Sequence, residues 1–364
     1  MPERIYLDHN ATAPLRPEAR AAMQDAMGLV GNPSSVHAEG RETRRLVERA
    51  RAQVAALLQC EPDAVIFTSG ATEAIAMALA PADTVSALSV EHDAVMAWAD
   101  RVLPVHEEDG DLRLISNFED VRGVVCCQIA NSETGILQPI SHHAPNAKIL
   151  TDATQAAGKR PIGLVSETEA YVISAHKFGG PKAAGALAVG AGWDIPALIR
   201  GGGQERSKRA GTENVVGIAG FGAAAEAAAR DLEAGVWTAV EKLRNILEER
   251  LSEAAPDLIC IGKDVSRLPN TSCFAIPGWK GETQVMQMDL AGFAVSAGSA
   301  CSSGKVGPSR VLKAMGFDDV TAQSALRVSL GPTTTAAEVH AFADAWIDRY
   351  RRFSAKRPAE DRVP

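Results

Sequence analysis

Helical and strand-like hydrophobic patterns alternate along the first two-thirds of the chain. Residues 40–58, GRETRRLVERARAQVAALL, repeat apolar positions at helical spacing and place basic residues on the outer face. Short apolar runs of strand length lie at 64–70, 84–90, 121–130, 147–153, 170–177 and 184–190, and residues 71–80 between two of them have helical character. Strands that alternate with helices predict an α/β fold with a mainly parallel sheet.

The pattern changes in the last third of the chain. Residues 219–251 are rich in Ala, Glu and Arg and lack Pro, so they predict one long helix that connects two domains. From about Ala254 the predicted secondary structure is of the α+β kind, with strand-like runs at 257–262, 270–278, 293–298 and 325–331. An amphipathic helix is predicted at 336–353.

Composition and charge exclude several classes of protein. Of the 364 residues, 46% are hydrophobic and 23% charged, as in ordinary soluble globular proteins, and this length favours two domains. The formal net charge of −8 argues against nucleic acid or an anionic membrane as the main partner. No apolar run approaches the roughly 18 residues of a spanning helix, and no signal peptide is visible. We therefore expect a cytoplasmic protein.

One of the six cysteines differs from the others. No CxxC pair is present, so reduced thiols are expected, and Cys60, Cys126, Cys127, Cys260 and Cys273 are predicted to pack as small hydrophobic side chains. Cys301 instead lies in VSAGSACSSG (295–304), among Ser, Ala and Gly, which allow the chain to move. It is the candidate reactive thiol.

The motif TSGATEA (68–74) follows a predicted strand and opens a helix. The turn at Gly70 leaves the amides of Ala71 and Thr72 at the helix N-terminus, which is suited to a phosphate group. The alternative is a simple helix cap made by Ser69 or Thr72.

Two further strands end in polar side chains. Asp152 ends the run at 147–153, where a carboxylate could hold a cation or cap the next turn. Ser174, His176 and Lys177 end the run at 170–177, where Lys177 is either a desolvated amine nucleophile or an exposed loop residue. A phosphate site, a strand-end Asp and a strand-end Lys together match the needs of pyridoxal 5′-phosphate (PLP).

The chain resembles a known family in motifs that run from YLDHNATAP near its start to LRVSLG near its end. GNPSSVHAEGR, FTSGATEA, ANSETG, TDATQAAGK, SAHKFGGPKAAGAL, GGGQERSKRAGTEN and SAGSACSSG are similar to motifs of the NifS/IscS-type cysteine desulfurases. These enzymes belong to the class V aminotransferase group of PLP fold-type I enzymes. The resemblance implies a large domain over residues 16–250 and a small α+β domain made of residues 1–15 and 251–364.

The same resemblance implies roles for the residues that match the motifs. Lys177 would bind PLP covalently and Asp152 would pair with its pyridine nitrogen. His92 would stack on the ring and move protons; read alone, it could be a core histidine. The other implied contacts are Gln155 near the ring hydroxyl, Ala71, Thr72, Ser174 and His176 at the phosphate, Thr212 at the phosphate of the partner subunit in a homodimer, and Asn32 and Arg327 at the substrate carboxylate. Read alone, Arg327 could form a surface ion pair.

The chain departs from the family pattern at two places. The usual NNETG motif reads Asn131-Ser132-Glu133-Thr134-Gly135 here, so Ser132 stands near the cofactor ring oxygen, where a longer Asn is usual. Only about ten residues separate LQPI from ILTDA, and a loop is expected where the family usually has a helix.

The resemblance also implies the reaction. Cys301 would take the sulfur of L-cysteine as a persulfide, release L-alanine and pass the sulfur to a scaffold protein of the IscU/NifU kind for iron–sulfur cluster assembly. The sequence around Cys301 resembles that of NifS and IscS more than that of SufS. This resemblance predicts sulfur transfer without an obligatory SufE-like activator. Nitrogenase maturation and tRNA thiolation are alternative destinations of the sulfur.

Other functions are compatible with parts of the sequence pattern. The alternatives are a selenocysteine lyase, another PLP-dependent class V enzyme, and a weakly catalytic sulfur carrier. A transient 2Fe–2S cluster ligated by Cys301 would need further ligands, because one cysteine cannot build a cluster site.

Overall fold

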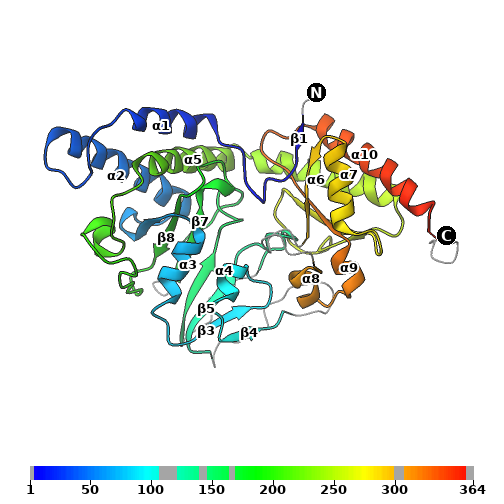
Figure 1. Ribbon diagram of the computed structural model, residues 1–364, viewed down its shortest axis with the longest axis horizontal. Coiled ribbons are helices and arrows are strands. Elements are labelled where there is room, and N and C mark those ends of the chain that lie inside the picture. Colours follow the sequence, from blue (N-terminus) through cyan, green and yellow to red (C-terminus); the bar gives the residue numbers. More distant parts are fainter. Residues whose placement is uncertain (1–3, 106–120, 139–145, 164–168, 299–306, 358–364) are drawn as a thin grey trace.

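The computed structural model describes residues 4–105, 121–138, 146–163, 169–298 and 307–357 (Figure 1). Cys301 and the predicted short loop after LQPI lie outside the described residues. Within the described residues, no helix is long and apolar enough to cross a membrane. The described cysteines are free thiols, and Cys126, Cys127 and Cys273 are buried as predicted.

A seven-stranded sheet forms the centre of the larger part of the molecule. Its spatial order is β2 (Val65–Thr68), β8 (Gly185–Val189), β7 (Glu169–Ser174), β6 (Ala147–Asp152), β5 (Gly123–Gln128), β3 (Val85–Leu88) and β4 (Arg101–Leu103). All neighbours are parallel except β8, which runs antiparallel to both β2 and β7. The prediction of a mainly parallel sheet is confirmed.

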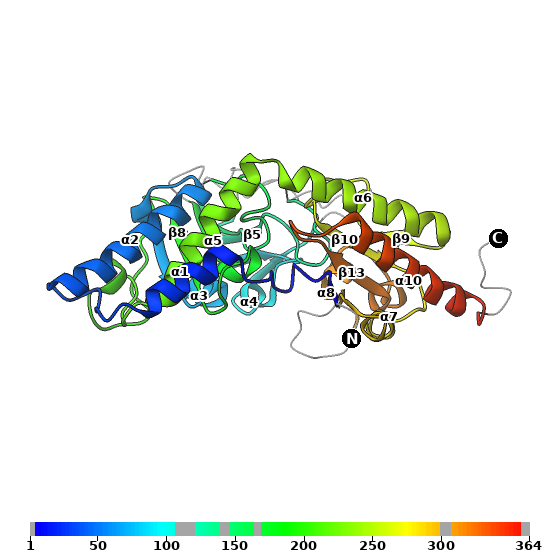
Figure 2. The ribbon, with the colours of Figure 1, turned by 90° about the horizontal axis from the view of Figure 1, so that it is seen from above.

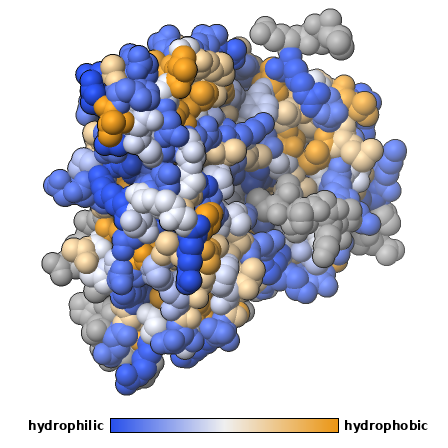
Figure 3. Space-filling view, turned by 60° about the vertical axis from the view of Figure 1, so that its left-hand side comes forward, coloured by the Kyte–Doolittle hydropathy of each residue, from blue (hydrophilic) through white to orange (hydrophobic). Residues whose placement is uncertain are grey.

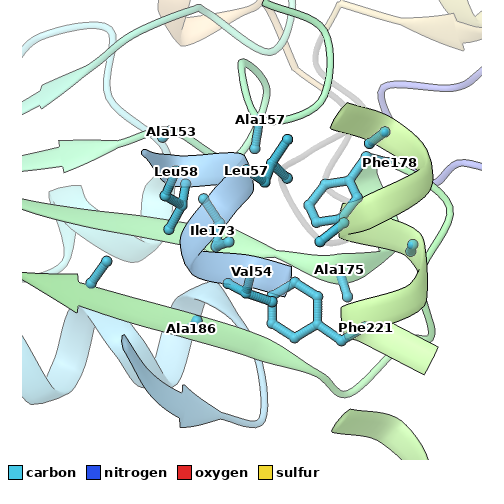
Figure 4. Packing of buried hydrophobic residues seen from close by; sticks show 14 of the residues in the cluster. Val54, Leu57, Leu58, Ala153, Ala157, Ile173, Ala175, Phe178, Ala186 and Phe221 are labelled. Carbon is cyan, nitrogen blue, oxygen red and sulfur yellow. The ribbon is translucent and has the colours of Figure 1, made fainter. Parts of the chain in front are cut away.

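Helices cover both faces of this sheet, which explains why its strands are continuous apolar runs. On one face lie α1 (Pro17–Met27), α2 (Ala38–Leu58) and α5 (Val215–Glu233). Val54 and Leu58 of α2 pack there with Ile173 of β7 and Phe221 of α5 (Figure 4). On the other face lie α3 (Ala71–Leu79) and α4 (Asp93–Met96). Ile75 and other buried residues of α3 share a core there with residues of the strands.

The prediction of one continuous helix over residues 219–251 is wrong. Two helices occupy this region, α5 and α6 (Val236–Ala254), and they are separated by Ala234 and Gly235. Gly235 has φ +70°, a left-handed conformation that an L-residue adopts only at a cost, so the helix ends there.

The smaller part of the molecule is the predicted α+β region. A four-stranded sheet has the order β12 (Ser296–Ala297), β13 (Ala325–Ser329), β10 (Thr271–Ala275) and β9 (Ile259–Cys260). The N-terminal strand β1 (Ile5–Tyr6) pairs with β11 (Phe293–Ala294), which places the start of the chain beside its last third. The helices are α7 (Gly281–Leu290), α8 (Arg310–Ala314), α9 (Asp319–Gln323) and α10 (Ala336–Ser354).

Helix α6 lies beside α10 in both ribbon views (Figures 1 and 2). Its residues Trp237, Val240 and Leu247 share a core with Phe274 and Trp346. The packing thus joins residues 236–254 to the C-terminal core, while the division of the chain at residues 15 and 250 remains a prediction.

The face shown in Figure 3 presents mainly hydrophilic residues, with small separate hydrophobic groups between them. Three exposed apolar side chains, Met27, Val30 and Val36, belong to the end of α1 and the connection to α2. This connection carries the GNPSS motif.

Candidate active site

A cavity of about 500 Å³ opens at the carboxyl ends of β5, β6 and β7. This is where parallel α/β sheets bind ligands. The cavity brings together nine of the residues predicted to bind a cofactor: Ala71, Thr72, His92, Ser132, Asp152, Gln155, Ser174, His176 and Lys177.

The N-terminus of α3 forms one wall of the cavity. Gly70 precedes the helix, and no side chain caps it, so capping by Ser69 or Thr72 is not observed. Strand β8 approaches closely, because a Cβ on Gly185 would lie 2.6 Å from the Cα of Gly70. The backbone amides at the start of α3 are therefore available to an anion.

Lys177 lies at the end of a short 3-10 helix (Ala175–Lys177) that directly follows β7. Its Nζ donates to the carbonyl oxygens of Asn10 (2.9 Å) and Ala11 (3.0 Å), so the amine is held at the cavity wall. Ala11 and Thr12 line the cavity too. Both belong to the YLDHNATAP motif, but the sequence alone predicts no site role for them.

His176 is held in its neutral form. Its Nδ1 lies 3.2 Å from Oγ1 of Thr12. Burial, followed by the charges of Lys177 and Lys182, lowers the pKa of His176 to about 4. At neutral pH the ring can therefore act as a hydrogen-bond partner without carrying charge.

Asp152 both caps a turn and faces the cavity. Its Oδ1 accepts from the amide of Thr154 (2.9 Å). The hydroxyl of Thr154 also borders the cavity and has no hydrogen-bond partner among the described residues. Asp152 thus presents a negative charge beside a hydroxyl that is ready to bind a ligand.

Glu91 lies behind Asp152 and was not found from the sequence. Its side chain is completely buried, and its Oε1 accepts from the amide of Gln128 (2.7 Å), the residue opposite Asp152 in the sheet. Burial, and then the charge of Asp152, raise the pKa of Glu91 to about 8. The neighbouring His92 is exposed and caps α4 through Nδ1, so it is not a core histidine.

Gln155 belongs to a buried hydrogen-bond network. Its Nε2 donates to the carbonyl of Asn10 (3.0 Å), and its Oε1 accepts from Nζ of Lys159 (2.8 Å). Lys159 also donates to Oδ1 of Asn10 (3.1 Å). Burial, followed by the charges of Lys177 and Arg327, lowers the pKa of Lys159 well below its usual range. Asn10 and Lys159, which sequence reasoning missed, fix the orientation of Gln155.

Arg327 does not line the cavity itself but contacts Ser132, which does. Its guanidinium donates to the carbonyl of Ser132 (3.0 Å) and to Oδ1 of Asp8 (2.8 Å). The side chain is buried, so the alternative of a surface ion pair does not hold. In this structure the predicted carboxylate clamp thus contacts the cavity through Ser132.

Two further predicted site residues, Asn32 and Thr212, do not line the cavity of this chain. Asn32 is exposed, and its Oδ1 accepts from the amide of Ser34 (2.8 Å). Thr212 is also exposed, and it was predicted to act in the partner subunit. Cys301, the candidate nucleophile and candidate cluster ligand, lies outside the described residues. Elsewhere in the described part of the chain, no group of three His, Cys, Asp or Glu side chains could hold a metal ion.

The donor set fits PLP. Lys177 supplies an amine, Asp152 a carboxylate, α3 an uncapped N-terminus and Thr154 an unpartnered hydroxyl. The cavity volume lies in the range of roughly 300–1,000 Å³ that is usual for cofactor sites.

Comparison with known proteins agrees with this geometry. The family model described as aminotransferase class-V matches residues 5–342. A cysteine desulfurase from Cereibacter sphaeroides is 42% identical over 93% of each chain. The cysteine desulfurase IscS from Dictyoglomus turgidum is 36% identical, again over 93% of each chain. The X-ray structure of a NifS-like protein from Rickettsia africae has a TM-score of 0.85 and 30% identity, and the match covers 96% of this chain and all of that one. This chain therefore belongs to the class-V aminotransferase family, among the NifS/IscS-type cysteine desulfurases of PLP fold type I.

Proposed function

We propose that this protein is a PLP-dependent cysteine desulfurase that converts L-cysteine to L-alanine and holds the sulfur as a persulfide on Cys301. One observation carries the proposal: Lys177, Asp152 and the uncapped N-terminus of α3 converge on a single cavity. When bound there, PLP supplies an electron sink for the carbon atoms of the substrate.

Residues of this chain bind the cofactor and move the protons of the reaction. The amine of Lys177, held near two backbone carbonyls, binds the cofactor and then moves the proton of the substrate Cα. The carboxylate of Asp152 keeps the pyridine nitrogen protonated. His92 is exposed and lines the cavity, so it would lie beside the ring and move a second proton.

The reaction balances without an external oxidant or reductant. The thiolate of Cys301 attacks the substrate sulfur, an S–S bond forms and the Cβ–S bond breaks. The electron pair of that bond stays with Cβ, which takes up one proton and becomes the methyl group of alanine. The transferred sulfur loses these two electrons to Cβ and so reaches the persulfide level, and an added thiol reductant then releases it as sulfide. A partly ionised Cys301 favours this attack, since the thiolate is the nucleophile.

The sulfur acceptor belongs to the same proposal. We expect a scaffold protein of the IscU/NifU kind and a role in iron–sulfur cluster assembly, which the IscS name of a relative supports. Supply of sulfur to nitrogenase maturation or to tRNA thiolation is the alternative. Transfer assays with purified acceptors would separate these destinations.

We also propose a cytoplasmic homodimer in which Thr212 reaches the cofactor phosphate of the partner subunit. Thr212 is exposed and does not line the cavity of its own chain. The exposed Val30 and Val36 flank Asn32 and offer apolar surface for a second copy. Light scattering of the purified protein gives its mass, and a monomer would contradict this arrangement.

Substitution of the lysine tests the function directly. Lys177→Ala is expected to lose the visible absorbance of bound PLP and all formation of alanine from L-cysteine, because the variant lacks the amine that would bind the cofactor and move the substrate proton. Lys242→Ala, which changes an exposed lysine on α6, is the matched control and keeps both signals. If Lys177→Ala made alanine at the wild-type rate, the proposed function of this site would be wrong.

A further inference from the structure

The side-chain amide of Gln155 is buried and lines the cofactor cavity. Both of its polar atoms have partners in the protein. Its Nε2 donates to the carbonyl oxygen of Asn10 (3.0 Å), and its Oε1 accepts from Nζ of Lys159 (2.8 Å). An amide nitrogen carries two hydrogens, so Nε2 keeps one N–H beyond its bond to Asn10.

These two partners fix which end of the amide faces which way. Nζ of Lys159 has hydrogens to donate, so the oxygen of Gln155 faces it. Lys159 does not line the cofactor cavity, so this bond draws Oε1 away from the cavity. Reversing the amide would set Oε1 against the carbonyl oxygen of Asn10, and two acceptors repel each other. The cavity therefore meets an N–H of Gln155 rather than its oxygen.

Lys159 is held in place by residues that are distant in the sequence. Its Nζ also donates to Oδ1 of Asn10 (3.1 Å), which accepts in addition from Nδ2 of Asn270 (3.0 Å). Nδ2 of Asn10 donates to Oγ1 of Thr271 (2.9 Å). Because this network is buried, each of its bonds is costly to lose. The amine that orients Gln155 thus has a fixed position of its own.

The network also reaches the amine that binds the cofactor. The carbonyl oxygen of Asn10 accepts from Nζ of Lys177 (2.9 Å) as well as from Nε2 of Gln155. In PLP, the ring hydroxyl is attached next to the carbon that carries the lysine-reactive aldehyde. A donor that shares an acceptor with Lys177 is therefore well placed for the ring oxygen.

We propose that Lys159 is a positioning residue that fixes the amide of Gln155 so that its remaining N–H, and not its oxygen, meets the ring oxygen of PLP. This inference rests on the proposed role of Lys177 in binding the cofactor. An N–H donor stabilises the ionised ring oxygen. The orientation therefore lowers the pH at which bound PLP loses a proton and changes its visible absorbance.

Charge near Lys159 has to be separated from this hydrogen-bonding role. Burial, followed by the charges of Lys177 and Arg327, lowers the pKa of Lys159 well below its usual range. His9 lies near this amine too. Burial, and then the charge of Lys159, lower the pKa of His9 to about 4, while Asp8 acts in the opposite direction. A neutral amine still carries two N–H groups, enough for both hydrogen bonds that Nζ makes.

A double-mutant cycle tests whether Lys159 acts through Gln155. The readout is the pH midpoint of the change in visible absorbance of bound PLP, measured without L-cysteine. Gln155→Ala removes the donor and is expected to raise the midpoint by about one unit, since hydrogen bonds to charged groups are strong. Lys159→Met removes the amine with an unbranched apolar side chain and is expected to raise it by at least about half a unit. The double variant should have the midpoint of Gln155→Ala.

Lys159→Gln removes the same amine with a polar side chain, and the same pattern is expected for it. Lys242→Met, at an exposed position of α6, is the matched control and should keep the wild-type midpoint. Unchanged midpoints in both Lys159 variants would overturn the inference. Shifts that add in the double variant would overturn it too, because the charge would then act directly on the cofactor.

Loss of bound PLP from both Lys159 variants would also contradict the inference, since Lys159 would then support the whole site rather than the orientation of one amide. Failure of the proposed function has a different signature. A wild type that binds PLP but forms no alanine from L-cysteine would refute that function. The midpoints need only bound PLP, so they would still report on Lys159 and Gln155.

Discussion

Individual side chains at this site are controlled by burial and by their neighbours. Glu91 is completely enclosed and lies close enough to Asp152 for its pKa to rise to about 8. In the unfolded chain the same carboxyl ionises near its ordinary value of about 4.3. The folded protein therefore binds more protons than the unfolded chain between these values, and stability falls as the pH rises.

Glu91→Gln should remove this pH dependence. From pH 7 to pH 9, the wild type is expected to lose about 1 kcal/mol more unfolding free energy than the variant, because a carboxyl with a folded pKa of about 8 loses its proton in this range. Urea unfolding at several pH values measures the difference. Glu249→Gln, at an exposed position of α6, should follow the wild type. Parallel curves for wild type and Glu91→Gln would contradict this assignment.

Local sequence pattern pointed to candidate site residues where a polar side chain directly follows a strand. Asp152 and Lys177 come at strand ends, so local pattern placed both at the cavity. Asn10, Glu91 and Lys159 were missed, because their roles depend on hydrogen bonds to residues far away in the sequence. Such contacts have no local signature.

At the scale of elements, the hydrophobic periodicity gave the correct type for α2, α3 and six of the seven strands of the larger sheet, but it predicted neither α1 nor β4. It could not give the direction of β8, since alternation and burial are the same for parallel and antiparallel strands. The break between α5 and α6 was missed, because the strong helix formers Leu232, Glu233 and Ala234 lead into Gly235 and the region contains no Pro. The break has a structural use, as it allows α6 to pack on the C-terminal core beside α10.

Gly235→Ala tests the reason for this break. A Cβ there meets no atom within 4 Å, so the cost comes only from the φ of +70°. We expect a loss of about 1 kcal/mol in unfolding free energy, the lower end of the cost of left-handed backbone for an L-residue. Gly28→Ala, at φ −78°, is the control and should change stability by less than about 0.5 kcal/mol. A neutral effect of Gly235→Ala in denaturant unfolding would mean that the chain relaxes at this junction.

At the scale of the whole molecule, the site is assembled from distant parts of the chain. The N-terminal segment supplies Asn10 and Ala11, the sheet domain supplies Asp152 and Lys177, and β13 supplies Arg327. The segment around Asp8 bridges these parts, because it pairs with Ser329 and binds Arg327. The family resemblance predicted that Arg327 joins Asp152 and Lys177 at one site, whereas it gave no role to Asn10 or Ala11.

The central claim is that sulfur passes through a persulfide on Cys301. The most direct measurement compares wild type with Cys301→Ala, given L-cysteine and a thiol reductant, by quantifying alanine and sulfide and recording the PLP spectrum. The account predicts equal amounts of both products from the wild type, and a variant that keeps the PLP absorbance but forms neither product. Release of alanine and sulfide by Cys301→Ala at the wild-type rate would contradict it and show that this thiol is not the nucleophile.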